Sequence, residues 1–108
     1  MMQLVGEHIK EIRRLCQQYN VEEMYVFGSV LNSKFTFGSD VDFLVRFSGV
    51  DLLDYFDNYM SLKERLAASL SRNIDLVEVQ TLKNPILKQS IDRDKVLVYG
   101  RENTQMFT

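Results

Sequence analysis

Four short runs of strand-forming residues alternate along this chain with segments of helical periodicity, and this order limits the fold more than any other feature. The strand-type runs cover residues 24–27, 41–47, 74–79 and 95–99. Apolar residues recur at intervals of three and four in the segments that we expect to form amphipathic helices, 3–19 and 52–70. A proline opens a further short helix over 85–92. We therefore expect an α/β (α+β) domain in which helices pack on a single mixed sheet of about four strands.

The length of 108 residues is that of one domain. We expect 1–108 to form a single domain with its core at about 3–100, and residues 101–108 to form a mobile polar tail. No run approaches the roughly 18 apolar residues of a transmembrane helix, and the charged N-terminus is unlike a signal peptide. The single cysteine, Cys16, fits a reducing compartment. We expect a cytoplasmic protein without membrane contact.

Charge and composition exclude several function classes. The net charge of −2 lacks the basic excess typical of proteins that coat nucleic acid. The only histidine, His8, lies beside the apolar stripe of the first helix, so a hydrolytic triad is not favoured. Cys16 falls on that stripe and is interpreted as a small buried hydrophobic residue. One cysteine also excludes zinc sites that are built on several cysteines.

A pair of aspartates carries the clearest chemical signal. Gly28 and Ser29 end the first strand-type run, and ten residues later comes Asp40-Val41-Asp42. Side chains alternate between the faces of a strand, so Asp40 and Asp42 are expected to point the same way. Two neighbouring carboxylates repel each other unless a cation lies between them. Mg²⁺ prefers carboxylate oxygens and keeps waters that substrate phosphates can replace.

A third acid and a glycine complete the pattern. Asp75 lies near the start of another strand-type run. If that strand lies beside the one that carries Asp42, three carboxylates converge and could hold two metal ions for a phosphoryl or nucleotidyl displacement. Gly28 would let the backbone approach a phosphate closely, and the amides that follow it, together with the Ser29 hydroxyl, would donate hydrogen bonds.

These residues resemble the nucleotidyltransferase superfamily that includes DNA polymerase beta. The resemblance rests on residues 27–29, the ten-residue spacer, and segments 39–45 and 74–77, and the order of elements matches over about 3–100. In size the chain is similar to the minimal nucleotidyltransferases (MNT), the antitoxin half of HEPN–MNT toxin–antitoxin pairs. The resemblance implies a nucleotidyltransferase fold and the transfer of AMP from ATP to a tyrosine hydroxyl of a HEPN toxin, which silences that toxin.

The resemblance also implies roles for the site residues. Asp40, Asp42 and Asp75 would be both the metal ligands, with two Mg²⁺ ions, and the catalytic residues, with Asp75 helping to activate the acceptor hydroxyl. Gly28 and Ser29 would hold the terminal phosphates of the nucleotide.

One departure from the family pattern keeps an alternative open. Many members have a basic residue and a glycine three and four positions after the serine, where this chain has Asn32 and Ser33. Lys34 could take over the contact to the nucleotide. The alternative is a weak or inactive relative that neutralises its partner by occlusion.

The acceptor is expected to arrive on another molecule, because the chain has no room for a second acceptor-binding domain after its last strand. This disfavours a small-molecule acceptor, and the acidic charge disfavours nucleic-acid polymerisation. Tyr55, Tyr59 and Phe107 are candidate docking anchors, although the first two are better explained as core residues. The sequence leaves the oligomeric state open, a homo-oligomer included.

Overall fold

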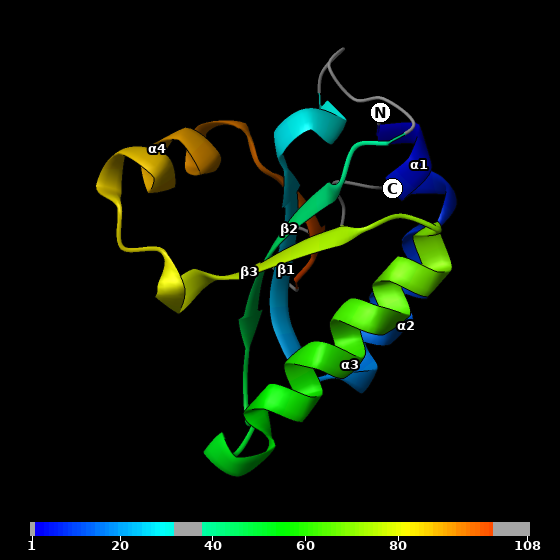
Figure 1. The fold of residues 1–108 in the computed structure, drawn as a ribbon, viewed down its shortest axis with the longest axis vertical. Coiled ribbons are helices and arrows are strands. Elements are labelled where there is room, and N and C mark those ends of the chain that lie inside the picture. The colour runs from blue at the N-terminus through cyan, green and yellow to red at the C-terminus, as the bar shows by residue number, and fades with distance from the viewer. Residues whose placement is uncertain (1, 32–37, 101–108) are drawn as a thin grey trace.

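The computed structural model describes residues 2–31 and 38–100 and contains a mixed four-stranded sheet (Figure 1). The strand order is β3-β2-β1-β4. Strand β1 (Val21–Phe27) is antiparallel to β2 (Val41–Phe47) and to β4 (Val96–Tyr99). Strand β3 (Ile74–Glu78) runs parallel to β2. The predicted mixed sheet of four strands is therefore confirmed.

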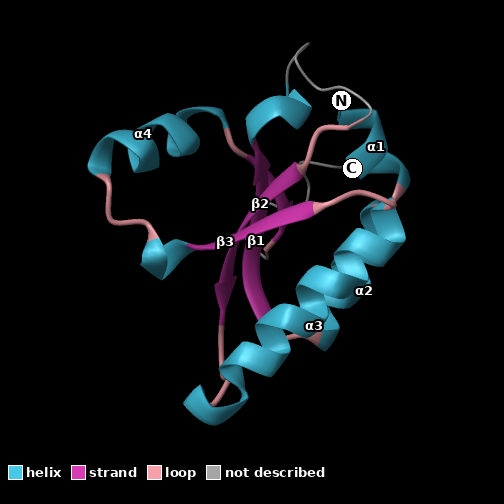
Figure 2. Cartoon of the chain, viewed as in Figure 1, coloured by secondary structure: helices cyan, strands magenta, loops and turns pink. Residues whose placement is uncertain are grey.

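Four α-helices flank this sheet: α1 (Met2–Glu7), α2 (Ile9–Gln18), α3 (Leu52–Leu70) and α4 (Pro85–Asp94). Helices α2 and α3 lie side by side on one face of the sheet, and α4 lies on the other (Figures 1 and 2). Two short 3-10 helices follow strands, η1 (Gly28–Leu31) after β1 and η2 (Val79–Thr81) after β3. The helix predicted at 52–70 is confirmed, and the one predicted at 85–92 extends by two residues. None of the helices within the described ranges is long and apolar enough to cross a membrane.

The main core fills the layer between the sheet and helices α2 and α3. Its members include the fully buried side chains of Ile12, Met24, Phe43, Leu62 and Leu66. Because strand side chains alternate, Phe43 faces this core while its neighbours in β2 face α4. We call the side of the sheet that bears α4 the α4 face.

Cys16 is buried in the main core, as predicted. Its Sγ lies 3.6 Å from the sulfur of Met24, and burial raises the pKa of the thiol. Cys16 is therefore a packing residue, since a buried thiol with a raised pKa makes a poor nucleophile.

The first helix was predicted as one segment over 3–19, and that prediction is wrong at His8. The chain breaks there into α1 and α2, because the His8 amide bonds to the Val5 carbonyl at 3.1 Å and tightens the last turn of α1. The His8 ring is half-buried, and its Nδ1 lies 2.9 Å from the Leu4 carbonyl oxygen. This contact with the backbone of the preceding turn gives the His8 side chain a structural role.

Three strand boundaries differ from the prediction: β4 begins at Val96, one residue later than predicted, and two others differ because of side-chain contacts. β1 begins at Val21, three residues earlier than predicted, although Glu22 and Glu23 are poor strand formers. Glu23 is held there by an ion pair with Arg46 on β2, with 3.4 Å between nitrogen and oxygen. At the other end of the sheet, the Glu78 carboxylate accepts a hydrogen bond from the Gln80 amide at 2.6 Å and ends β3 one residue early.

Several predictions fall on residues outside the described ranges. These are the departure at Asn32 and Ser33, the nucleotide contact of Lys34, the docking role of Phe107 and the tail at 101–108.

Candidate active site

The register of the sheet places Phe27, Asp42 and Asp75 in one row across three strands. Phe27 is the partner of Asp42 in the β1–β2 ladder, and Asp75 is the partner of Asp42 in the β2–β3 ladder. Residues that lie opposite each other on paired strands point to the same face. The row therefore lies on the α4 face, at the ends of β1 and at the beginnings of β2 and β3. Of the three carboxylates that the sequence predicts to converge, Asp42 and Asp75 lie opposite each other on adjacent strands.

Asp40 lies immediately before β2 with an exposed side chain. Two contacts from the residues that precede β3 hold in place the segment that leads into β2. The Val41 amide donates to the Asn73 carbonyl at 3.0 Å, and Arg72 Nη1 donates to the Ser39 carbonyl at 3.3 Å. These contacts fix the path of the chain around Asp40 beside the residues that precede β3. Sequence reasoning missed Arg72 and Asn73 because their role depends on contacts between segments far apart in the chain.

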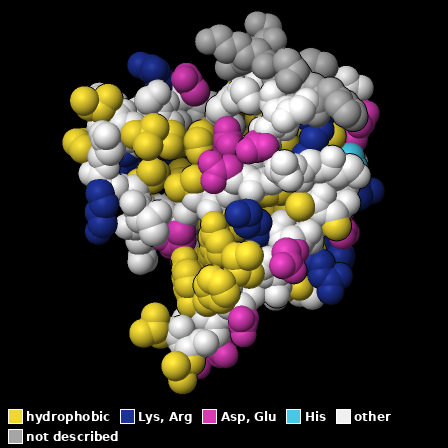
Figure 3. Space-filling view, viewed as in Figure 1, with side chains coloured by type: hydrophobic (Ala, Val, Ile, Leu, Met, Phe, Trp, Pro, Cys, Tyr) yellow, Lys and Arg dark blue, Asp and Glu magenta, His cyan; other side chains and the backbone are white. Residues whose placement is uncertain are grey.

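The electrostatics of Asp42 reflect its position between the other two acids. Burial raises the pKa of Asp42 to about 6, and the negative charges of Asp75 and Asp40 add to this shift. Figure 3 shows a group of acidic side chains near the centre of the face that is in view there. Over the described ranges, however, no three Asp, Glu, His or Cys side chains are already arranged to hold a metal ion. The three acids lie near one another but do not form a preformed set of metal ligands.

Gly28 brings the backbone directly against the Asp42 carboxylate. The residue has a φ of +80°, and a Cβ built on it would lie 2.2 Å from Asp42 Oδ2. No side chain fits at that distance, so the close approach requires glycine. Ser29 follows in the first turn of η1 and is half-buried. The structure thus places Gly28 against the Asp42 carboxylate, with Ser29 next to it in the chain.

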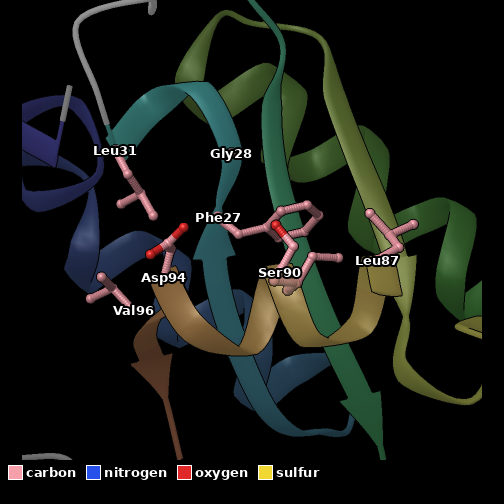
Figure 4. Close-up of a pocket in the computed structure, with 8 residues that line it drawn as sticks. Phe27, Gly28, Leu31, Leu87, Ser90, Asp94 and Val96 are labelled. Carbon is pink, nitrogen blue, oxygen red and sulfur yellow. The ribbon is translucent and has the colours of Figure 1, made fainter. Parts of the chain in front are cut away.

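A pocket of about 780 Å³ opens next to this row, between η1, α4 and the neighbouring ends of β1 and β4 (Figure 4). It shares two residues with the site, Phe27 and Gly28. Most of its other lining side chains are apolar, and Ser90 and Asp94 on α4 are the polar ones. Among the residues that the structure describes, the lining consists of Phe27, Gly28, Leu31, Leu87, Ser90, Ile91, Asp94 and Val96.

Comparison with known proteins decides the family. A family model described as polymerase beta, nucleotidyltransferase matches residues 10–104. The chain belongs to this family. A protein adenylyltransferase MntA of Thermococcus cleftensis is 38% identical over 85 residues, which span 79% of this nucleotidyltransferase and 80% of the relative. A candidate protein adenylyltransferase of Methanocaldococcus jannaschii is 35% identical over 103 residues, which span 90% of this chain and all of the relative.

Solved structures agree on the fold. A candidate minimal nucleotidyltransferase has a TM-score of 0.72 at 27% identity, over 88% of this nucleotidyltransferase and 93% of the matched chain. A complex of a tri-AMPylated Shewanella oneidensis HEPN toxin with an MNT antitoxin gives a TM-score of 0.63 at 22% identity. That match covers 99% of this chain and 80% of the matched chain. The predicted nucleotidyltransferase fold is thereby confirmed.

The aromatic residues of α3 are largely structural in this nucleotidyltransferase. The Tyr59 hydroxyl donates to the Leu76 carbonyl on β3, and the Tyr55 ring meets Phe47 edge-on at a centroid distance of 5.5 Å. Burial is the main cause of the raised pKa of both tyrosines. Tyr59 thus packs against the core, as expected, whereas Tyr55 lies outside the core cluster and contacts Phe47.

One sequence prediction about α3 is wrong. The apolar spacing over 52–70 predicts that Leu52 and Phe56 belong to the face that packs in the core, but they are 89% and 69% exposed, and Leu53 beside Leu52 is 95% exposed. Figure 1 shows the reason, because the N-terminal turns of α3 extend beyond the end of the sheet. Helical periodicity does not reveal where the neighbouring layer stops.

We expect Gly28→Ala to be more damaging than Gly49→Ala. Both glycines have positive φ, at +80° and +74°, so each alanine costs about 1–2 kcal/mol of backbone strain. Only at Gly28 does the new Cβ also collide with Asp42, since nothing lies within 4 Å at Gly49. The collision adds at least about 1 kcal/mol, by the cost of overpacking. Urea unfolding of the two variants measures this difference, and equal losses would contradict the close approach.

We also expect the stability difference between Asp42→Asn and the wild type to depend on pH in metal-free buffer. The folded pKa of about 6 lies above the ordinary aspartate value of 3.8, so the folded state binds more protons between pH 4 and pH 6. Wild-type stability therefore falls, relative to the variant, as the pH rises through this window. Thermal melts in EDTA should show the variant more stable at pH 7.5, with the difference disappearing near pH 4. Glu64→Gln on α3 controls for the loss of one negative charge. A difference independent of pH would refute the assignment.

Proposed function

We propose that this nucleotidyltransferase is a Mg²⁺-dependent protein adenylyltransferase that moves AMP from ATP to a tyrosine hydroxyl of a HEPN-type toxin, and that it thereby acts as an antitoxin. The observation that carries the proposal is the juxtaposition of Gly28 with the acids Asp42 and Asp75. The names of the relatives, MntA and protein adenylyltransferase, support it. The solved complex of a tri-AMPylated HEPN toxin with an MNT antitoxin supports the choice of partner.

The three acids are the residues that would hold Mg²⁺ in this proposal. Asp40, Asp42 and Asp75 offer the oxygen ligands that this ion prefers. The mutual repulsion that helps raise the pKa of Asp42 is a cost that a bound cation relieves. When bound, Mg²⁺ neutralises charge on the triphosphate and makes the attacking hydroxyl more acidic.

The chain's own groups position the nucleotide and move the proton. The backbone amides at Gly28 and Ser29 and the Ser29 hydroxyl donate hydrogen bonds to the terminal phosphates, and Lys34 adds a positive charge. The Asp75 carboxylate takes the proton of the acceptor hydroxyl. The hydroxyl oxygen then forms a bond to the α-phosphorus, the bond from that phosphorus to the α,β-bridging oxygen breaks, and pyrophosphate leaves.

The position of Asp75 favours an acceptor that arrives on another chain. β3 is an edge strand of the described sheet, and Asp75 is exposed on it. A second pocket, of about 400 Å³ and mainly apolar, lies between β3 and the N-terminal half of α3, and Leu76, the neighbour of Asp75, lines it. Phe56 lines this pocket and is exposed, and the exposed side chains of Leu52 and Leu53 precede it on α3. Asp75 faces the other side of this edge strand, so a partner that docks here would present its tyrosine to Asp75 around the edge of the sheet.

The same apolar surface supports occlusion as the second candidate function. A relative without activity could still cover its toxin by contacts at Leu53 and Phe56, which are exposed. Such contacts would not require a bound nucleotide. In that case site variants would neutralise the toxin as well as the wild type does.

The test measures transfer of label from α-labelled ATP to a purified HEPN-type toxin of the same genome. Asp42→Asn and Asp75→Asn are each expected to lower the rate of transfer at least about 100-fold, by the size of a general acid–base contribution. Glu64→Gln, an exposed acid on α3, should transfer label at the wild-type rate. Unchanged transfer by Asp42→Asn would overturn the catalytic assignment. No transfer by the wild type, combined with full neutralisation by Asp42→Asn, would establish occlusion instead.

A further inference from the structure

We infer that the 780 Å³ pocket under α4 holds the nucleoside of the nucleotide, with the base and ribose between η1 and α4 and the triphosphate directed over Gly28 toward the acids. This inference rests on the proposed function and specifies how its substrate is bound. It follows from three features of the pocket, namely its lining, its position in the row of residues across the sheet, and its roof.

The lining suits an uncharged flat group better than a phosphate. The volume lies within the roughly 300–1,000 Å³ of small-molecule sites. Phe27, Leu31 and Ile91 provide apolar walls, and no lysine or arginine is among the lining residues in the part of the chain that the structure describes. The one charged group is the Asp94 carboxylate, which Figure 4 shows directed from α4 toward Leu31. A carboxylate repels phosphate but accepts hydrogen bonds from ribose hydroxyls or from a base amino group.

The position of the pocket fixes the direction of the nucleotide. Phe27, Asp42 and Asp75 lie in this order across β1, β2 and β3. The pocket lies at the Phe27 end, whereas the exposed Asp75 lies at the other end. A nucleoside at one end and an acceptor hydroxyl at the other leave the reacting phosphate over Asp42. Gly28 belongs to both the pocket and the close approach to Asp42, so the two compartments are continuous.

The roof of the pocket is a helix that stands away from the sheet. Ile91 is the one buried side chain of α4, and Ser90 beside it is exposed. The C-terminal end of the helix is nevertheless held in place. Lys95 lies 4.1 Å above the Tyr25 ring and 2.8 Å from Asp92. The helix is therefore anchored at one end and leaves room beneath its middle turns.

The test compares two ligands on one protein by titration calorimetry with Mg²⁺: the non-hydrolysable ATP analogue AMP-PNP and inorganic tripolyphosphate. Ser90→Phe puts a ring into the pocket, and we expect it to weaken AMP-PNP binding at least tenfold while leaving tripolyphosphate binding within twofold of the wild type. Gln89→Phe is the matched control, since it adds the same ring at the next exposed position of α4, which does not line the pocket. It should change neither affinity by more than twofold.

A second variant tests the role of the charged group. Asp94→Ala removes a repulsive charge, so it should strengthen tripolyphosphate binding or leave it unchanged, yet weaken AMP-PNP binding about threefold to tenfold by loss of a hydrogen bond. Wild-type AMP-PNP affinity in Ser90→Phe would overturn the inference, as would a wild type that binds the two ligands equally well. A wild type that binds neither ligand would overturn the proposed function itself.

Discussion

The contact between the Gly28 backbone and the Asp42 carboxylate is the constraint on which the site depends. It requires that β1 and β2 pair in the observed register, with Phe27 opposite Asp42, and that the chain turn sharply into η1 with a positive φ. Only glycine meets both conditions, because a Cβ would fall 2.2 Å from the carboxylate oxygen. A shift by one residue in this pairing would turn Asp42 into the main core. The apolar face of β2, with Phe43 fully buried, prevents that shift.

The acids on the surface of the sheet lower the stability of the metal-free fold, and they also supply the carboxylates of the proposed site. Asp42 is partly buried between Asp40 and Asp75, and both burial and like charge oppose its ionisation. Such a group destabilises the metal-free fold at neutral pH. A cation bound beside Asp42 would relieve this repulsion. The arrangement of the three carboxylates is therefore unfavourable in the metal-free protein and becomes favourable when a cation binds. Perturbed groups of this kind gather at functional sites.

Much of the fold and of the site could be predicted from the sequence because both depend on local patterns. Alternation in 41–47 and apolar spacing in 52–70 reflect which side of each element meets the core. The juxtaposition of Asp42 and Asp75 followed from the two strand assignments and one assumption, that the strands are neighbours. Parallel pairing of β2 and β3 satisfies that assumption.

What could not be predicted depends on contacts between distant segments. The early start of β1 at Val21 is one case, since Glu23 pairs there with Arg46 of β2, whereas the break at His8 is an exception that is set by a local turn. The exposure of Leu52 at the start of α3 depends on where the sheet ends. The space beneath α4 is another such feature, since it depends on how far the helix stands from the strands, and no residue pattern encodes that distance.

The central claim is that the ends of β1, β2 and β3 together form the metal–nucleotide site. Paramagnetic broadening of amide NMR signals tests it most directly, with substoichiometric Mn²⁺ added to the labelled protein in the presence of AMP-PNP. The account predicts the strongest loss of signal at Gly28, Asp42 and Asp75 and at their neighbours. Broadening centred instead on the exposed acids at the start of α3, such as Asp51 and Asp54, would contradict it.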